Sequence, residues 1–243
     1  MTAPRLGAIV VVVPIRNEIE LLGSCLTSLQ IAESRFDADG HDLPVSVVLV
    51  ADSCTDGSEE LARASGFSVI AVQAGAVGAA RAAGVTAALA TFRNFPLDRI
   101  WVASTDADSE VPAHWLNHHH DAAEAGLDVL VGTVRPREGD LSAEQMQRWA
   151  ARRIPGQPNG HVHGANLGIR ANVLAGLGGF PAVREHEDVH VVAAAIHARA
   201  RVGASDHAEV VTSGRMIGRT PGGYARHLRE TYANFDSVRA SVF

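Results

Sequence analysis

The feature that most constrains the fold is an uninterrupted run of apolar, mostly β-branched residues near the start of the chain, Ala8–Val13. Such a run is expected of a strand that is covered on both faces, as in a parallel sheet. Similar runs recur, and amphipathic helical patterns separate them. In the first half, strands are expected at 8–13, 45–50, 69–72 and 100–103, and helices at 20–34, 59–65 and 79–92. This alternation predicts an α/β fold with a mainly parallel central sheet flanked by helices.

The second half of the chain is less regular. Strands are expected at 128–134 and 164–170, and a basic helix from residue 222 onwards. The capping box Ser142-Ala-Glu-Gln145 predicts a helix to about residue 153, with Leu141 and Met146 as its hydrophobic staple. With the Gly/Pro segment that follows, this helix could form a lid over a substrate, or simply lie on the surface before a stiff connector.

Length, charge and cysteine content narrow the class of protein. The chain has 243 residues, 47% of them hydrophobic, enough for one full α/β core, and no linker divides it, so we expect a single domain, 1–243. A net charge of −6 and 5% aromatic residues argue against a nucleic-acid partner. Cys25 and Cys54 are too few for a disulfide framework, and reduced thiols are a better interpretation than one bridge.

The hydropathy pattern is used to predict the cellular compartment of the protein. The longest apolar run, Ala8–Val13, is far shorter than the ~20 residues that span a bilayer, and no signal-peptide cleavage pattern follows it. We therefore expect a cytoplasmic protein with no integral membrane segment.

Charged residues gather where the expected strands of the first half end. Arg16 and Glu18 follow the first strand, Asp52 the second, and Asp106 and Asp108 the fourth. The carboxyl ends of parallel strands meet at one edge of a sheet, where ligands bind. Separate loops that deliver charge to one edge therefore predict a binding site.

The pair Asp106-Ala107-Asp108 is the sharpest of these signals. Two carboxylates one residue apart can reach a Mg²⁺ or Mn²⁺ that also binds a diphosphate. Paired acids in loops are usually only solvated turn residues, but the neighbouring charged loops favour a functional interpretation here. Asp56 lies in a turn before a helix, so we expect it to be structural, and Asp52 to accept a hydrogen bond from a nucleobase.

The segment Gly75–Gly84 opens a helix with glycines and places Arg81 one turn in. Its backbone amides and the arginine could approach an anion. It is not a G-x-G-x-x-G after the first strand, and the chain contains no G-x-x-x-x-G-K-[ST], so dinucleotide binding and P-loop ATPase activity are disfavoured.

Together these segments resemble glycosyltransferase family 2, which has the GT-A fold. The matching stretches are Val13–Glu18, Asp52–Ser58, Gly78–Gly84, Ser104–Asp108, His163–Arg170, Gly178–Phe180 and Glu187–Asp188, in the family's order over nearly the whole chain. No single stretch is decisive; the ordered set is. The resemblance implies a metal-dependent, inverting transfer of one sugar from a UDP- or GDP-type nucleotide-diphosphate sugar to an acceptor hydroxyl. Residues 1–110 would form the nucleotide-binding half and 111–243 the acceptor-side half.

The resemblance also implies a role for each matching residue. The nucleotide pocket would be lined by Pro14, Arg16, Glu18 and Asp52, and the donor would adjoin Arg81, Asp106 and Ala107. The metal, Mn²⁺ or Mg²⁺, would be bound by Asp108. The donor sugar and the acceptor would be bordered by Gly164, Ala165 and Asn166, and the general base would be Asp188. A free aspartate, with a pKa near 3.9, is too weak to ionise a sugar hydroxyl in advance. Such a base would take the proton late, and leaving-group stabilisation and positioning would supply most of the catalysis.

The chain also departs from the family pattern. Ala51 stands where many relatives carry an acid, and the Gln-x-x-Arg-Trp motif and membrane helices of processive synthases are missing, so we expect one transfer per acceptor. Arg215 and Arg219 could clamp the diphosphate from the C-terminal side or belong to a basic surface loop, and the sequence favours neither.

Histidines are frequent, at 12 in the chain. His118-His119-His120 falls in a helical pattern whose consecutive residues face different sides, and we expect a solvated face. GT-A enzymes often complete the metal shell with a late histidine. His207 is the candidate here, and His190, one helical turn after His186, is the rival.

Two other functions stay open. A sugar-phosphate nucleotidyltransferase would share the parallel sheet, although the loop after the first strand lacks the glycines usual in that class. A non-catalytic nucleotide-sugar-binding protein would share the fold, although a metal ligand and a base are both in place. The donor base and sugar, the acceptor (a small molecule, a lipid or a glycan) and the presence of a homodimer are not decided by the sequence.

Overall fold

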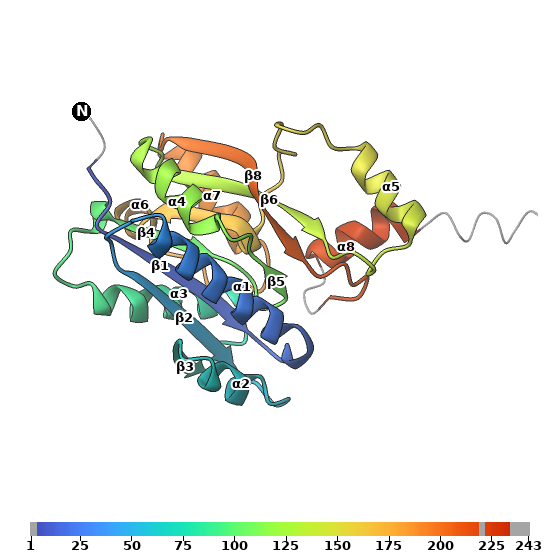
Figure 1. Ribbon diagram of the computed structural model, residues 1–243, viewed down its shortest axis with the longest axis horizontal. Coiled ribbons are helices and arrows are strands. Elements are labelled where there is room, and N and C mark those ends of the chain that lie inside the picture. Colours follow the sequence, from blue (N-terminus) through green and yellow to red (C-terminus); the bar gives the residue numbers. More distant parts are fainter. Residues whose placement is uncertain (1–3, 219–221, 234–243) are drawn as a thin grey trace, which may run out of the picture.

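The computed structural model describes residues 4–218 and 222–233, which are built around one twisted eight-stranded sheet (Figure 1). The strands are β1 (Ala8–Ile15), β2 (Val45–Asp52), β3 (Ser68–Val72), β4 (Ile100–Ser104), β5 (Ser109–Glu110), β6 (Val129–Pro136), β7 (Leu167–Arg170) and β8 (Val202–Thr212). The α-helices are α1 (Ile19–Ala38), α2 (Ser58–Ala64), α3 (Val77–Thr91), α4 (Trp115–Glu124), α5 (Ala143–Ala151), α6 (Ala171–Gly176), α7 (Glu187–His197) and α8 (Tyr224–Leu228). Short helical segments are η1 (Leu97–Arg99), η2 (Gly164–Asn166) and η3 (Arg229–Ala233).

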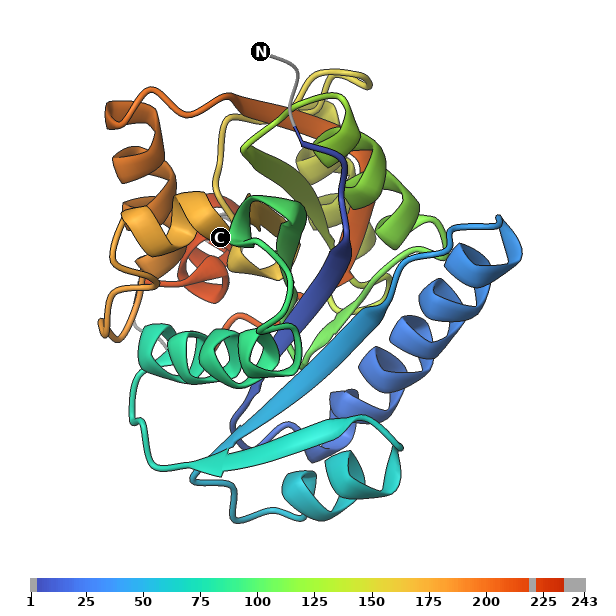
Figure 2. The same cartoon turned by 90° about the vertical axis from the view of Figure 1, so that its left-hand side faces the viewer.

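Helices cover both faces of the sheet, as the β-branched runs predict. Successive residues of β1 point to opposite faces, so Val11 packs in one hydrophobic core with α1, α2 and α4, and Val12 packs in the other with α3, α6 and α7. Figure 2 shows α1 (blue) and α3 (green-blue) on opposite sides of β1 and β2.

The strand order is β3-β2-β1-β4-β7-β6-β8-β5, and its two halves differ. β1 to β4 are parallel, as expected. In the second half, β7 runs antiparallel to both β4 and β6, and only the pair β6 and β8 is parallel. The sheet is therefore mainly parallel, as expected, with four of its seven strand pairs parallel, and each antiparallel pair contains β7 or β8 of the second half. The connection from β6 to β7 contains α5, which packs on α8 and not on the sheet, so it does not act as a crossover helix.

The antiparallel pairing brings late segments of the chain to the edge where the early strands end. Ser104, the last residue of β4, pairs with Leu167, the first of β7, so η2 lies beside the loop that follows β4. Thr212, the last residue of β8, pairs with Ser109 in that same loop. Residues from three distant parts of the sequence meet at one edge of the sheet.

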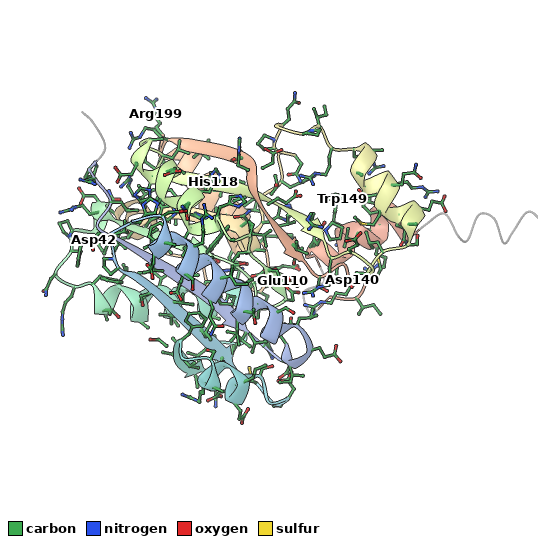
Figure 3. All side chains as sticks on the ribbon, in the orientation of Figure 1. Asp42, Glu110, His118, Asp140, Trp149 and Arg199 are labelled. Atoms are coloured by element: carbon green, nitrogen blue, oxygen red, sulfur yellow. The ribbon has the colours of Figure 1, made fainter. Side chains whose placement is uncertain are left out.

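The capping box predicted for the second half is present at the start of α5. The Ser142 hydroxyl accepts from the Gln145 amide, and the Gln145 side chain accepts from the Ser142 amide. α5 packs on α8 and η3 through a small separate cluster that contains Leu141, Leu228 and Tyr232. This unit lies at the opposite end of the molecule from β3, as Figures 1 and 3 show for α5 and its Trp149.

The expected solvated face at residues 118–120 is wrong for His119. His119 follows Trp115 by one helical turn, so it lies on the buried stripe of α4 and is fully buried. Trp101 Nε1 donates to its Nδ1 at 3.0 Å, and burial lowers its pKa to about 3. Both cysteines are free thiols. No helix within residues 4–218 and 222–233 is long and apolar enough to cross a membrane.

Candidate functional site

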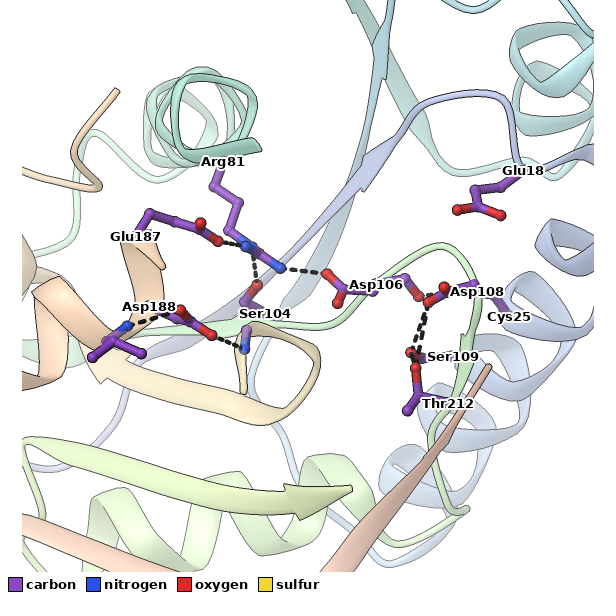
Figure 4. Close-up of polar contacts among 12 residues, drawn as sticks. Glu18, Cys25, Arg81, Ser104, Asp106, Asp108, Ser109, Glu187, Asp188 and Thr212 are labelled. Carbon is purple, nitrogen blue, oxygen red and sulfur yellow. Dashed lines mark hydrogen bonds and ion pairs between the residues drawn. The ribbon is translucent and has the colours of Figure 1, made fainter. Parts of the chain in front are cut away.

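A buried arginine links the loop after β4 to the start of α7. Arg81, on the second turn of α3, forms ion pairs with Asp106 and Glu187, and its Nε donates to the Ser104 hydroxyl at 2.8 Å (Figure 4). The side chains of Arg81 and Glu187 are each only 3% exposed. Gly164 packs directly on the guanidinium, since a Cβ there would lie 2.5–2.7 Å from its atoms. Arg81 is thus a charged cross-link between α3, the loop after β4 and α7. Within the described residues its polar partners are Ser104, Asp106 and Glu187.

The candidate base follows Glu187 directly. The Asp188 carboxylate accepts from the Gly164 amide at 2.5 Å and from the Val189 amide at 2.8 Å. It therefore lies between η2 and the first turn of α7 (Figure 4), close to the ion pair of Arg81 with Asp106. Negative charges near the N-terminus of a helix are stabilised by its dipole, which favours both acids at this position.

Asp108 faces the other side of the loop. Its Oδ1 accepts from the Ser109 hydroxyl at 3.2 Å, and Thr212 Oγ1 lies 3.4 Å away at the end of β8. Arg215 donates to Asp108 Oδ2 at 2.8 Å and forms a bidentate ion pair with the Glu18 carboxylate at 2.8 and 3.0 Å. Arg215 therefore lies at the strand ends, which favours the clamp over the surface loop, whereas Arg219 lies outside the described residues.

Burial and charge both affect the acids of this loop. Burial raises the pKa of Asp106, and the Arg81 guanidinium opposes that rise. Burial and then the nearby Asp106 carboxylate raise the pKa of Asp108, and Arg215 opposes it. The buried Cys25 thiol, whose pKa burial also raises, donates to the Asp106 carbonyl at 3.4 Å from beneath the loop. The site thus holds clustered carboxylates whose charge two arginines partly neutralise.

The remaining residues of the expected nucleotide pocket lie at the ends of β1 and β2. Asp52 is buried, and its carboxylate accepts from the Ala74 amide at 2.8 Å and the Gly75 amide at 3.0 Å. The exposed Arg16 guanidinium is 3.7 Å from it, and Pro14 is half-buried at the end of β1. A carboxylate has about four acceptor positions, so Asp52 can also accept from a base, and that role stays a prediction.

Asp56 has the structural contacts expected of it. Its carboxylate accepts from the Ser58 amide at the start of α2 and from the Ile19 amide at the start of α1, each at 3.0 Å. It therefore joins the two helix N-termini that follow β1 and β2.

Two residues expected to border the donor sugar and the acceptor, Asn166 and Ala165, have buried side chains. The Asn166 side chain joins α4, β6 and β8: it accepts from Trp115 Nε1 at 2.9 Å and donates to the carbonyls of Thr133 and Ala208. Both N–H donors of its amide are thus bound to the protein, and its contact with a donor sugar stays a prediction. Ala165, in the same turn, has a buried side chain in the core that includes Trp115. Backbone of η2 can still adjoin a ligand, as the Gly164 amide adjoins Asp188.

Ala107 and His207 occupy very different surroundings. The Ala107 side chain points into the core, so only its backbone lies at the site. His207 lies in an irregular part of β8, where one residue of β6, Thr133, stands opposite four of β8 (206–209), and its ring stacks 5.9 Å from His118 on α4. The described residues contain no group of three or more His, Cys, Asp or Glu side chains that could hold a metal. His207 and its rival His190 are both exposed, and a metal-ligand role for either stays a prediction.

The donor set still fits a hard divalent cation shared with a nucleotide. Mg²⁺ near phosphates usually has one or two protein carboxylates, and substrate and water oxygens complete its shell. Asp108 supplies such a carboxylate at the mouth of the site, and a positive group, the Arg215 guanidinium, already lies against it. Asp108, with Glu18 nearby, would hold the ion.

Sequence reasoning missed several residues of the site. Glu187 was matched to the family without a role, and its burial could not be foreseen because its partner Arg81 is distant in the sequence. Ser109 and Thr212 orient Asp108 only because β8 pairs with β5, and β8 was not predicted. No local pattern signals these contacts.

Comparison with known proteins agrees with this geometry. The model of glycosyl transferase family 2 matches residues 10–177. No curated protein matches the sequence. The fold is similar to that of Staphylococcus aureus TarS 1–349, with a TM-score of 0.60 and 18% identity over 86% of this chain and 61% of that one. It is also similar to the mannosyltransferase PcManGT from Pyrobaculum calidifontis in complex with GDP-Man and Mn²⁺, with a TM-score of 0.60 and 19% identity over 99% of this chain and 66% of that one.

A third similar structure is glucosyl-3-phosphoglycerate synthase from Mycobacterium tuberculosis in complex with Mn²⁺, UDP and glucosyl-3-phosphoglycerate. Its TM-score is 0.55, with 16% identity over 91% of this chain and 77% of that one. At such identities the likeness shows the GT-A fold alone, and this chain spans less than two thirds of the TarS structure. Asp188 lies beyond the matched range, so its placement rests on the contacts described above. The family match spans residues 10–177 of 243 and includes the acids after β1, β2 and β4, so the chain belongs to glycosyl transferase family 2.

Proposed function

We propose that this chain, as a single domain, is a metal-dependent, inverting glycosyltransferase that moves one sugar from a UDP- or GDP-type donor to an acceptor hydroxyl. The observation that carries the proposal is the connection between two acids on distant segments. Arg81 pairs with Asp106 on the donor-side loop and with Glu187, the neighbour of Asp188. A donor held at Asp106 and Asp108 therefore lies within reach of a base at Asp188.

The donor-side residues have distinct roles in this proposal. Asp108, with Glu18 beside it, would hold Mn²⁺ or Mg²⁺, which would supply positive charge against the diphosphate leaving group. Arg215 contacts both acids, and its side chain is partly exposed, so its guanidinium can also bind the diphosphate. Asp52 and Arg16, 3.7 Å apart, bind the base and its nearby polar groups.

Asp188 acts as the general base. The amides of Gly164 and Val189 fix both of its oxygens, so the carboxylate has a defined orientation before the acceptor arrives. As the acceptor hydroxyl forms its bond to the anomeric carbon and the bond to the diphosphate breaks, the hydroxyl proton passes to Asp188. Attack from the face opposite the diphosphate inverts the anomeric centre.

Thermal unfolding with UDP-, GDP- and dTDP-sugars, each with and without Mn²⁺, tests the donor site. A ligand at a hundredfold excess over Kd adds about 2.7 kcal/mol, which raises the midpoint by roughly 5–10 °C in a domain of this size. We expect a shift for one nucleotide class that requires Mn²⁺ and is lost in Asp108→Ala. Absence of any shift in a folded sample would contradict the proposal. Release of pyrophosphate from a nucleoside triphosphate would indicate a nucleotidyltransferase instead.

A further inference from the structure

Two buried polar atoms, one just before η2 and one on α8, have unused hydrogen-bonding capacity within the described residues. One is His163 Nε2, on the residue before Gly164. The other is the hydroxyl of Tyr224, the first residue of α8: the Trp149 indole beside it can only donate, so the phenol proton is left without an acceptor. A buried polar group left unpaired costs about 1–3 kcal/mol. Two such groups in ring contact beside a candidate catalytic residue indicate a place that a ligand completes.

Aromatic and imidazole rings surround these two atoms. His163 and Tyr224 pack edge to face with their ring centroids 5.5 Å apart, and His227 stacks on Tyr224 at 6.1 Å. His161 adjoins both histidines, at 6.2 Å from His163 and 5.3 Å from His227. We call these four residues the ring cluster. Its rings come from the segment between α5 and η2 and from α8, and His163 adjoins Gly164, whose amide donates to Asp188.

The chemistry of the ring cluster favours a neutral hydroxyl over an anion. Burial lowers the pKa of His163 to about 4, so its ring is neutral at pH 7 and offers one donor and one acceptor nitrogen. A hydroxyl can both donate and accept, so it can pair with Nε2 in either tautomer and also with the phenol. An anion accepts only, and the nearby Asp188 carboxylate repels it. Aromatic faces suit the apolar faces of a sugar ring.

We propose that the ring cluster binds a sugar acceptor, whose hydroxyls hydrogen-bond to His163 Nε2 and to the Tyr224 phenol while its ring packs on the aromatic walls. This proposal rests on the proposed glycosyl transfer, because it assigns the acceptor of that reaction. His163 and Tyr224 are then specificity-determining residues. They act on the acceptor and not on the donor, which lies with Asp106 and Asp108.

Nitrogen-15 NMR of the histidine rings tests the proposal without the natural acceptor. The probes are the methyl glycosides of glucose, galactose, mannose and N-acetylglucosamine, added at pH 7 to the full chain with Mg²⁺ and UDP or GDP. We expect at least one glycoside to shift the His163 ring nitrogens, assigned by their loss in His163→Asn. In His163→Asn and Tyr224→Phe the Kd of that glycoside should rise about five- to tenfold, as for one lost neutral hydrogen bond.

The matched control is His197→Asn, at the exposed end of α7, which should leave the glycoside Kd unchanged. The proposal is overturned if no glycoside shifts His163, or if methyl phosphate shifts it and the glycosides do not. It is also overturned if the glycosides bind equally well to both ring-cluster variants. Thermal shifts with UDP and GDP on the same samples separate the two proposals, since loss of acceptor binding leaves nucleotide binding intact.

Discussion

The two halves of the site differ in how far their polar contacts reach along the chain. In the nucleotide-side half, Asp52 is held by amides 22 and 23 residues away, and Asp56 by the amide of Ser58, two residues away. In the acceptor-side half, Arg215 reaches back 107 residues to Asp108 and 197 residues to Glu18. Asp52 and Asp56 are therefore held by amides of their own half, whereas Arg215 completes the site with long-range contacts to the other half. Substitutions in the two halves should have different consequences.

The largest effect is expected at the base in the acceptor-side half. Asp188→Asn keeps the size of the side chain but cannot take a proton, so kcat should fall about 10²- to 10⁴-fold, the usual contribution of a general base. Donor binding should persist. Steady-state kinetics with separate donor titrations measure both, and Asp121→Asn, whose side chain is 72% exposed, is the control. A kcat in Asp188→Asn close to that of the control would remove Asp188 from the mechanism.

The cross-link between the halves should dominate stability. Arg81→Met leaves Asp106 and the buried Glu187 without their cation, and loss of one partner of a buried ion pair costs about 3–5 kcal/mol. Arg63 pairs with Glu59 on the surface of α2 and is 53% exposed, so Arg63→Met should cost at most about 1 kcal/mol. Urea unfolding of both variants measures the difference. Equal losses would mean that the cross-link contributes no more than a surface pair.

A single methyl group tests how tightly η2 packs on that cross-link. A Cβ at Gly164 would meet the Arg81 guanidinium at 2.5–2.7 Å, so Gly164→Ala should cost about 1–3 kcal/mol through overpacking. Gly176, at the end of α6, has open space around it, and Gly176→Ala should be neutral or stabilising by up to about 1 kcal/mol. Thermal unfolding compares the two. If Gly164→Ala is as stable as Gly176→Ala, then η2 is not tightly packed on Arg81.

Near neutral pH the smallest effect is expected at the buried histidine of α4, and it grows as the pH falls. Burial lowers the pKa of folded His119 from 6.5 to about 3, so the unfolded chain binds one more proton between these values. Stability from this group is complete above pH 6.5 and is lost as pH falls toward 3, at about 1.4 kcal/mol per pH unit for one proton. His119→Gln keeps an acceptor for Trp101 and should flatten the stability slope between pH 6 and 5. An unchanged slope in urea titrations would assign the acid sensitivity to other groups.

The sequence predicts the nucleotide-side half of the molecule better than the acceptor-side half. β1 and β2 are recognisable because their residues are apolar and mostly β-branched, and the acids after them lie at the site because parallel strands end together. β8 was not predicted because partly buried and polar residues are mixed along it and because its pairing is irregular opposite Thr133. Glu187 is charged yet buried, a situation that depends on a partner 106 residues earlier in the chain. The periodicity of apolar residues indicates which positions of a helix or strand are buried. It does not indicate contacts between residues that only the tertiary fold brings together.

The central claim is that Asp108 holds a divalent metal together with a nucleotide diphosphate. Electron paramagnetic resonance of free Mn²⁺, titrated with the protein in the presence and absence of UDP or GDP, tests it directly. We expect one nucleotide to strengthen Mn²⁺ binding and Asp108→Ala to abolish this gain, whereas Asp121→Asn retains it. Mn²⁺ binding that no nucleotide strengthens, or that survives in Asp108→Ala, would contradict the account.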